Sequence, residues 1–214
     1  MNSINFVDRA KEYFRFLESE FGFRIIQESN SEIRPETNGA IEYVSNIIGI
    51  LIDSETGYVG VRIYRIKDGN NYYLTPIDIH EYLNTSDKEK ELLLSTNPAD
   101  KSLGSALFNQ KFLLNQPGWK GSRGTVQDLD NELMNFSSWL KSNANICLEG
   151  ELLQWIKIYE YKINRAKADH IKRGEDEFEY AQVKDATGNW KLIKQPIFQK
   201  ELAHIEKLKK ELSK

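Results

Sequence analysis

The residues able to do acid–base, nucleophilic or metal chemistry are few in this chain and widely spaced. The three histidines, His80, His170 and His204, lie far apart on predicted helices, and none has a second ligand at metal-binding spacing. The single cysteine, Cys147, stands between two aliphatic residues, which predicts an inert, buried thiol. We therefore predict no catalytic residue, no metal ligand and no cofactor site.

Carboxylates are the other candidates for metal chemistry. Asp128, Asp130 and Glu132 resemble a ligand run. On the predicted helix, however, only the first and third share a face, and Asp128 suits the helix N-terminus. Asp53 and Glu55 sit in a predicted turn, where acids favour the turn geometry. An enzyme of unidentified type is consequently the third of three interpretations.

A glycine-rich loop at residues 116–124, QPGWKGSRG, is the most suggestive local feature. Trp119, Lys120 and Arg123 alternate there with glycines, directly before a predicted helix. Backbone amides, two cations and a helix start can hold an anion, and an indole can stack on a base. The GxxxxGK[ST] pattern is absent, so a nucleotide P-loop is rejected. A surface loop whose Trp119 packs on the core, or a protein contact, stays open as an alternative.

A basic helical face and several aromatic residues complete the predicted binding set. Lys162 and Arg165 belong to the face at 157–173, which acids interrupt, as in an ordinary solvated face. Phe16 lies off the apolar stripe of the first predicted helix, and Tyr64 points away from the buried side of a strand, so both rings are predicted to be exposed. The candidate partner- or anion-binding residues are Trp119, Lys120, Arg123, Lys162, Arg165, Phe16 and Tyr64.

Composition places the chain among ordinary globular proteins. It has 214 residues, 40% hydrophobic and 29% charged, and no apolar run near the roughly 20 residues needed to cross a bilayer. A single cysteine and no apparent secretory signal predict a cytoplasmic protein without a membrane partner. The net charge of −3 divides into −7 for residues 1–100 and +4 for residues 101–214. The second half is therefore a candidate to meet an acidic partner, or the chain has two differently charged faces.

The N-terminal third predicts a helix followed by an antiparallel meander. Apolar residues recur at helical spacing over residues 6–21, with Ser3 or Asn5 as the cap and Gly22 at the end. Residues 23–29 predict the first strand. Residues 40–66 predict a β-hairpin broken once, at residues 53–57, and residues 72–77 predict a further strand. We expect four or five antiparallel strands.

The pattern then becomes helical. Short helices are predicted for residues 77–84, 87–96 and 101–115, and long helices for 125–140 and 148–172. Each long helix has one apolar face, so we expect the two to pack antiparallel against each other. A strand, a turn at residues 187–189 and a second strand follow at 174–196, and a helix from Pro196 ends the chain.

These elements predict an α+β fold. An N-terminal helix packs on an antiparallel β-meander, followed by a helical region with a long antiparallel helix pair, a late β-hairpin and a C-terminal helix. We predict a single α+β domain over residues 1–175, with the helix and meander at 1–76 and the helical part at 77–175. Residues 176–214, the hairpin and last helix, dock on that domain or project from it.

Part of this layout resembles a known group of proteins. A helix ending in FLESEFGF, then IEYVSNIIGILID and VGVRIYRI, and later SSWLKSNANICLEGELLQW, is similar to small uncharacterised bacterial cytoplasmic proteins. Many of these sit among polymorphic-toxin immunity and defence-island genes. The resemblance covers about the first 70 residues and, more loosely, residues 130–155; the late hairpin and last helix lie outside it. It implies a protein that acts by binding a partner and has no catalytic residues.

We accordingly expect a non-catalytic protein-binding module, an immunity-like or antiphage-defence accessory protein. Its partner would be a toxin or a subunit of a defence complex. The alternative is a nucleic-acid-binding component of a bacterial defence complex, which would use the basic C-terminal half.

Overall fold

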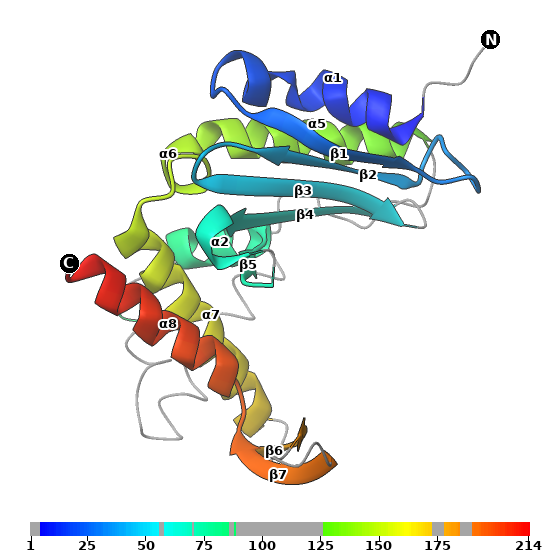
Figure 1. Ribbon diagram of the computed structural model, residues 1–214. Helices are drawn as coiled ribbons and strands as arrows, with labels where there is room; N and C mark the ends of the chain where they lie inside the picture. Colours follow the sequence, from blue (N-terminus) through cyan, green and yellow to red (C-terminus); the bar gives the residue numbers. More distant parts are fainter. Residues whose placement is uncertain are drawn as a thin grey trace. The chain divides into compact units, whose positions relative to one another are not determined.

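Figure 1 shows the computed structural model of the chain, which describes residues 5–55, 58–69, 71–85, 88, 126–172, 178–184 and 190–214. Its contacts divide the chain into two compact units. Unit 1 holds residues 1–80 and 116–154, and unit 2 holds residues 81–115 and 155–214. This division describes contact density, so the predicted domain limits, 1–175 and 176–214, stay a prediction.

Unit 1 begins with helix α1 (Phe6–Ser19), whose start is fixed by a side-chain cap. The Asn5 Oδ1 accepts a hydrogen bond of 2.9 Å from the backbone N–H of Asp8, as the sequence predicted for one of its two candidate caps. The helix ends where the Glu20 N–H donates to the Phe16 carbonyl, and Gly22, at φ +67°, then turns the chain toward the sheet.

The sheet of unit 1 is a five-stranded antiparallel meander, which confirms the predicted α+β class with a helix on a meander. Its strands are β1 (Arg24–Asn30), β2 (Gly39–Val44), β3 (Ile48–Glu55), β4 (Tyr58–Arg65) and β5 (Tyr73–Leu74), paired in chain order. A short 3₁₀ helix, η1 (Ile66–Asp68), joins the last two strands. Strand β5 is shorter than predicted because helix α2 (Pro76–Asn84) already begins at Pro76.

The predicted single hairpin at residues 40–66 is wrong in one respect, because the structure has three strands there. The extra turn lies at residues 45–47. Ser45 makes it: its Oγ accepts hydrogen bonds from the backbone N–H groups of Ile47 and Ile48, at 3.2 and 3.0 Å, and its own N–H donates to the Ile48 carbonyl. Aliphatic residues lie on both sides of this short turn, so the sequence pattern predicted one continuous strand there.

The central strands of the sheet bury the middle of one face, called the core face here. Cross-strand neighbours Tyr43, Ile50, Ile63 and Leu74 form one row across β2 to β5, and each is 0% exposed. Helix α1 lies on this face, since a Cβ added at Gly39 would touch side chains of that helix. Figure 1 shows α1 and α5 (Val126–Ser142) on the same side of the sheet.

Helix α5 closes unit 1 through polar contacts as well as its apolar face. The predicted apolar stripe is confirmed as buried. Arg9 of α1 donates twice to Asp130, at 2.8 and 2.9 Å, and Ser137 Oγ donates to the Tyr13 carbonyl at 2.6 Å. The buried residues of the stripe are Leu129, Leu133, Phe136 and Leu140.

Unit 2 is built around helices α7 (Leu152–Lys172) and α8 (Gln199–Leu212), which run side by side in Figure 1. The first turn of α7 belongs to unit 1. The apolar seam of α7 is buried, including Trp155 at 0% and Ile163 at 4%. His204 of α8 is buried with its ring edge-on to Tyr159 of α7, and the ring centroids are 5.5 Å apart. Among the described residues, no helix is long and apolar enough to span a membrane.

The two long helices each have a packing partner within their own unit, and their pairing with each other stays a prediction. Helix α5 packs with α1 and β4 inside unit 1, whereas from Trp155 onward α7 packs with α8 inside unit 2. The short helix α6 (Ala144–Cys147) comes between α5 and α7 in the chain. An apolar stripe shows that a helix needs cover, but the stripe does not say which element provides it.

Two late strands, β6 (Phe178–Lys184) and β7 (Trp190–Pro196), pair antiparallel in unit 2. Trp190 and Leu192 are each 64% exposed. The turn predicted at residues 187–189 lies outside the described residues, as do the helices predicted at 87–96 and 101–115, except for the single residue Lys88.

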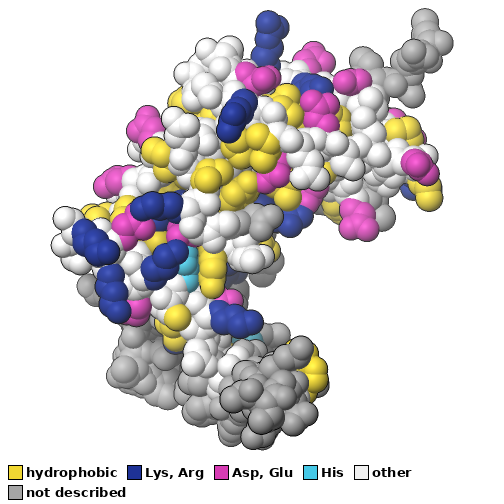
Figure 2. Space-filling model, viewed as in Figure 1, with side chains coloured by type: hydrophobic (Ala, Val, Ile, Leu, Met, Phe, Trp, Pro, Cys, Tyr) yellow, Lys and Arg dark blue, Asp and Glu magenta, His cyan; other side chains and the backbone are white. Residues whose placement is uncertain are grey.

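The two units carry opposite net charge. Unit 1 contains 11 Lys+Arg and 17 Asp+Glu, giving −6, and unit 2 contains 18 and 15, giving +3. Figure 2 shows lysine and arginine side chains gathered over α8. The charge asymmetry in the sequence therefore follows the division into units.

Candidate functional site

The second face of the sheet, called the open face here, is the leading candidate surface. Its residues alternate with those of the core face, so Glu42, Leu51 and Arg62 lie opposite one another across β2, β3 and β4. All three are partly exposed. Tyr58 and Tyr73, 55% and 36% exposed, belong to the same face by register. The open face thus presents polar and aromatic side chains, whereas the central row of the core face is buried.

Two glycines let large side chains lie flat on this face. Tyr64 is directly opposite Gly49, and a Cβ added at Gly49 would overlap the Tyr64 ring. Likewise, a Cβ added at Gly60 would overlap the carboxylate of its neighbour Asp53. The ring and the carboxylate therefore occupy the space above glycines of the adjacent strand.

Hydrogen bonds fix these flat side chains. The Tyr64 hydroxyl donates to Glu42 two strands away, and Arg62 forms an ion pair with Asp53. The Arg62 guanidinium also lies 5.8 Å from the centroid of the Tyr73 ring, a cation–π distance. Burial, and then the Glu42 carboxylate, raise the pKa of Tyr64, so its hydroxyl stays a donor at neutral pH. The open face is consequently ordered by its own contacts.

A buried carboxylate secures β4, which carries part of the open face. Glu132 of α5 is 9% exposed and accepts a hydrogen bond of 3.0 Å from the Val59 N–H. A side chain thus satisfies a backbone donor of this strand, beyond the part of it that β5 covers. The run of acids at residues 128–132 suggests a metal ligand, but Glu132 has this structural role instead.

Two predicted site residues, Phe16 and Tyr64, are buried, so the expectation that their rings are exposed is wrong. Phe16 is 8% exposed and packs with its centroid 6.3 Å from that of Phe14 and 6.1 Å from that of Phe21. The Lys141 ammonium covers its ring at 5.6 Å. Tyr64 is 6% exposed because its ring lies down over Gly49 rather than standing out. Contacts with two other aromatic rings explain the burial of Phe16. The missing side chain of Gly49 explains the burial of Tyr64.

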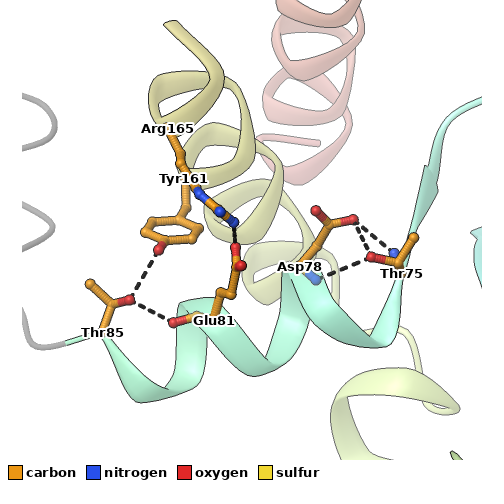
Figure 3. Close-up of polar contacts among 6 residues, drawn as sticks. All are labelled: Thr75, Asp78, Glu81, Thr85, Tyr161 and Arg165. Carbon is orange, nitrogen blue, oxygen red and sulfur yellow. Dashed lines mark hydrogen bonds and ion pairs between the residues drawn. The ribbon is translucent and has the colours of Figure 1, made fainter. Parts of the chain in front are cut away.

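Lys162 and Arg165, the two candidate site residues on the predicted basic face, are also engaged. Arg165 forms an ion pair with Glu81, whose side chain is only 4% exposed (Figure 3). Beside this pair, Thr85 and Tyr161 share a hydrogen bond of 3.0 Å between their hydroxyls. Lys162 is partly buried and has a contact of its own. Arg165 therefore holds α7 to the second half of α2, within unit 2.

Helix α2 starts on a reciprocal capping contact, also drawn in Figure 3. The Thr75 N–H and hydroxyl donate to Asp78 at 2.8 and 2.9 Å, while the Asp78 N–H donates to the Thr75 hydroxyl at 3.2 Å. These contacts stabilise the helix that presents Glu81. The remaining predicted site residues, Trp119, Lys120 and Arg123, lie outside the described residues, so their anion-binding role stays a prediction.

The groups able to do chemistry are inert or dispersed in the described residues. Cys147 is buried, as predicted, and burial raises the pKa of its thiol. Burial also lowers the pKa of His80, whereas His204 packs within unit 2. No three His, Cys, Asp or Glu side chains gather at metal-binding distance among these residues.

The sequence pattern does not identify the roles of Tyr73, Gly49 and Gly60 on the open face. Tyr73 was assigned to a strand without a role, yet it carries the exposed ring beside Arg62. Each glycine stands in a strand, where its missing side chain signals close approach by a neighbour. Which neighbour approaches depends on the register, which the sequence pattern alone does not give.

Comparisons with known proteins give no relative. No protein-family model, no curated protein and no solved structure matches the chain.

Proposed function

We propose that the protein is a non-catalytic protein-binding module that binds a partner through the open face of its unit 1 sheet. An immunity-like or antiphage-defence accessory role, with a toxin or defence-complex subunit as partner, is the form of this proposal that the resemblance in the sequence suggests. The observation that carries the binding proposal is the ordered polar and aromatic surface around Arg62, Tyr58 and Tyr73.

Three properties of this surface suit protein recognition. It combines tyrosines with an arginine, the residue types enriched at binding hot spots. The Arg62 side chain is 42% exposed and already held by Asp53 and Tyr73, so little side-chain freedom is lost on binding. The central row of the core face beneath it is buried, so the surface rests on a packed support.

A comparison of tagged variants tests the proposal. Wild-type protein expressed in its own host should co-purify with a discrete partner, and Tyr58→Ala/Tyr73→Ala should lose it at unchanged thermal stability. Ile33→Ala is the matched control because Ile33, 75% exposed, lies in the loop of unit 1 between β1 and β2. Recovery of the same partner by the double variant and by wild type would contradict the assignment of the open face.

The second candidate function, nucleic-acid binding, rests on the net charge of +3 in unit 2. The described cations chosen for it support it less, because Arg165 is bound to Glu81. An absorbance ratio at 260 and 280 nm typical of pure protein, together with no retention on DNA or RNA at about 50 mM salt, would remove this alternative.

A further inference from the structure

The two edges of the unit 1 sheet are built differently. Strand β5 forms one edge and has only two residues, and Glu132 accepts the hydrogen bond of the Val59 N–H on the part of β4 beyond it. Strand β1 forms the other edge and has seven residues. Short strands and covering groups prevent a sheet edge from pairing with other chains. A dedicated side chain thus protects the β4–β5 side of the sheet.

Strand β1 is exposed along most of its length. Six of its seven residues are exposed, and Ile25 is partly buried. Its inner side pairs with β2, and among the described residues no backbone group outside this ladder bonds to residues 24–30. A bulge at Ile26 interrupts the ladder, and four regular pairs follow it, from Gln27 to Asn30. The outward side of residues 27–30 is called the β1 edge here.

The directions of the backbone groups at the β1 edge follow from the ladder. The Ser31 N–H donates at 3.3 Å to the carbonyl of the residue before β2, which continues the pairing by one residue. Hydrogen-bonded and non-hydrogen-bonded pairs alternate along an antiparallel ladder. Gln27 and Ser29 therefore bond toward β2, whereas Glu28 and Asn30 direct their N–H and C=O groups away from it. Each of these two residues offers one donor and one acceptor to an added strand.

Of the features that block an exposed edge, β1 has only the bulge. Its sequence, RIIQESN, contains no proline and no lysine. Its one acid, Glu28, forms an ion pair of 2.7 Å with Lys11 of α1, so this carboxylate is held toward the core face. Ile26 presents an aliphatic side chain beside the edge and is 53% exposed. The β1 edge is therefore accessible to a further strand.

We propose that the β1 edge binds an extended segment of a partner protein, which joins the sheet as a further strand. The outward main-chain groups of Glu28 and Asn30 determine this chemistry, because an extended main chain presents donors and acceptors at the matching spacing. A helix fits less well, since its main-chain groups are bonded internally. A second copy of the chain also fits less well. Residues 27–30 are all polar, so two copies paired there would bury little apolar surface.

This inference goes beyond the proposed function by assigning a second surface and the conformation of its ligand. Tyr58 and Tyr73 of the open face belong to β4 and β5, which lie at the opposite side of the sheet from β1. A strand added beside β1 does not cover them. The two surfaces can therefore be tested separately.

A phage-displayed library of short, unconstrained random peptides tests the proposal. The purified full chain should enrich peptides rich in β-branched and aromatic residues, which favour extended structure. Asn30→Pro removes an outward N–H without removing a bond to β2, and should weaken the enriched peptides about tenfold or more. Asn30→Ala is the matched control, because it removes the side chain and keeps the N–H. It should change the affinity less than about twofold.

A second measurement uses the wild-type chain and does not depend on the folding of Asn30→Pro. N-methylation of every second backbone nitrogen of an enriched peptide blocks only one edge of that peptide as a strand. One such pattern should abolish binding, and the pattern shifted by one residue should not. Amide hydrogen exchange at Glu28 and Asn30 should also slow when the unmodified peptide is bound.

Four results would each overturn the inference. They are no enrichment, the same response to both methylation patterns, equal binding by Asn30→Pro and wild type, and unchanged hydrogen exchange at Glu28 and Asn30. Loss of the peptides in Tyr58→Ala/Tyr73→Ala would place them on the open face and would also overturn it. Because the Asn30 variants do not touch the open face, failure here leaves the test with Tyr58 and Tyr73 unaffected.

Discussion

The two faces of the unit 1 sheet are formed by the same strands but have different roles. On the core face, residues such as Ile50 and Ile63 are 0% exposed. They contribute to the free energy of unfolding because folding removes their apolar surface from water. On the open face, the neighbouring positions hold Leu51, Arg62 and Tyr64; Asp53 holds Arg62, and Tyr64 lies over Gly49 with its hydroxyl bonded to Glu42. Burial therefore stabilises the fold, whereas the polar contacts shape a surface.

The largest expected effect separates the two faces by stability. Ile50→Ala should lower the free energy of unfolding by about 2–5 kcal/mol, because it leaves a cavity in the core face. Leu51→Ala, at the next position and partly exposed, should cost about 1 kcal/mol or less. Urea unfolding followed by circular dichroism measures both. Equal losses would break the distinction between the faces.

The glycine opposite Tyr64 provides the next test. Gly49→Ala should cost about 1–3 kcal/mol, because the new methyl group overlaps the Tyr64 ring and displaces it. In a Tyr64→Ala background the same change should cost much less. A double-mutant cycle in urea measures the coupling. Additive effects of the two substitutions would show that the ring does not lie over Gly49.

The hydroxyl of Tyr64 should matter less than its ring. Tyr64→Phe removes the hydrogen bond to Glu42 and should cost about 0.5–1.5 kcal/mol at neutral pH. Folding raises the pKa of the Tyr64 phenol. The contribution of the neutral hydroxyl to the free energy of unfolding is therefore fully present below about pH 10 and is lost as the pH rises further.

Unfolding free energies between pH 9 and 12 test the sign of this dependence. The wild type should lose more stability over this range than Tyr64→Phe. A residual slope should remain in the variant, because burial also raises the pKa of Tyr43 and Cys147. A steeper slope in Tyr64→Phe than in wild type would contradict the assignment.

The smallest effect on stability should accompany a clear effect on binding. Arg62→Ala removes a partly exposed ion pair with Asp53 and should cost less than about 1 kcal/mol. It should nevertheless reduce recovery of the partner, since it removes a cation that is fixed beside Tyr73. Thermal melts paired with co-purification check both expectations. A large loss of stability with unchanged recovery of the partner would show that Arg62 stabilises the fold and does not contribute to binding.

The helix-on-meander order and most element positions were predictable, because they depend on local patterns. Alternation predicted that Val61 and Ile63 lie on the buried side of β4, and the spacing of apolar residues predicted which side of α5 is buried. The Ser45 turn was missed because it needs only three residues inside an apolar run. Local patterns identify elements well and short turns poorly.

The candidate site was less predictable because it depends on distant pairings. Tyr64 looks exposed until the register sets it over Gly49, and Arg165 looks free until Glu81 of another helix reaches it. The elements that cover α5 and α7 within their own units also lie far from them in the sequence. An apolar stripe is satisfied equally well by any complementary face, so the choice is made by the tertiary fold.

Photo-crosslinking inside the host cell tests the central claim most directly. A photoreactive phenylalanine placed at Tyr58 or Tyr73 should give one discrete crosslinked protein, whereas the same group at Ile33, which is exposed elsewhere in unit 1, should not. Mass spectrometry of the crosslinked band would identify the partner. A crosslink to the same partner from Ile33 and none from Tyr58 or Tyr73 would contradict the proposal that the open face is the binding surface.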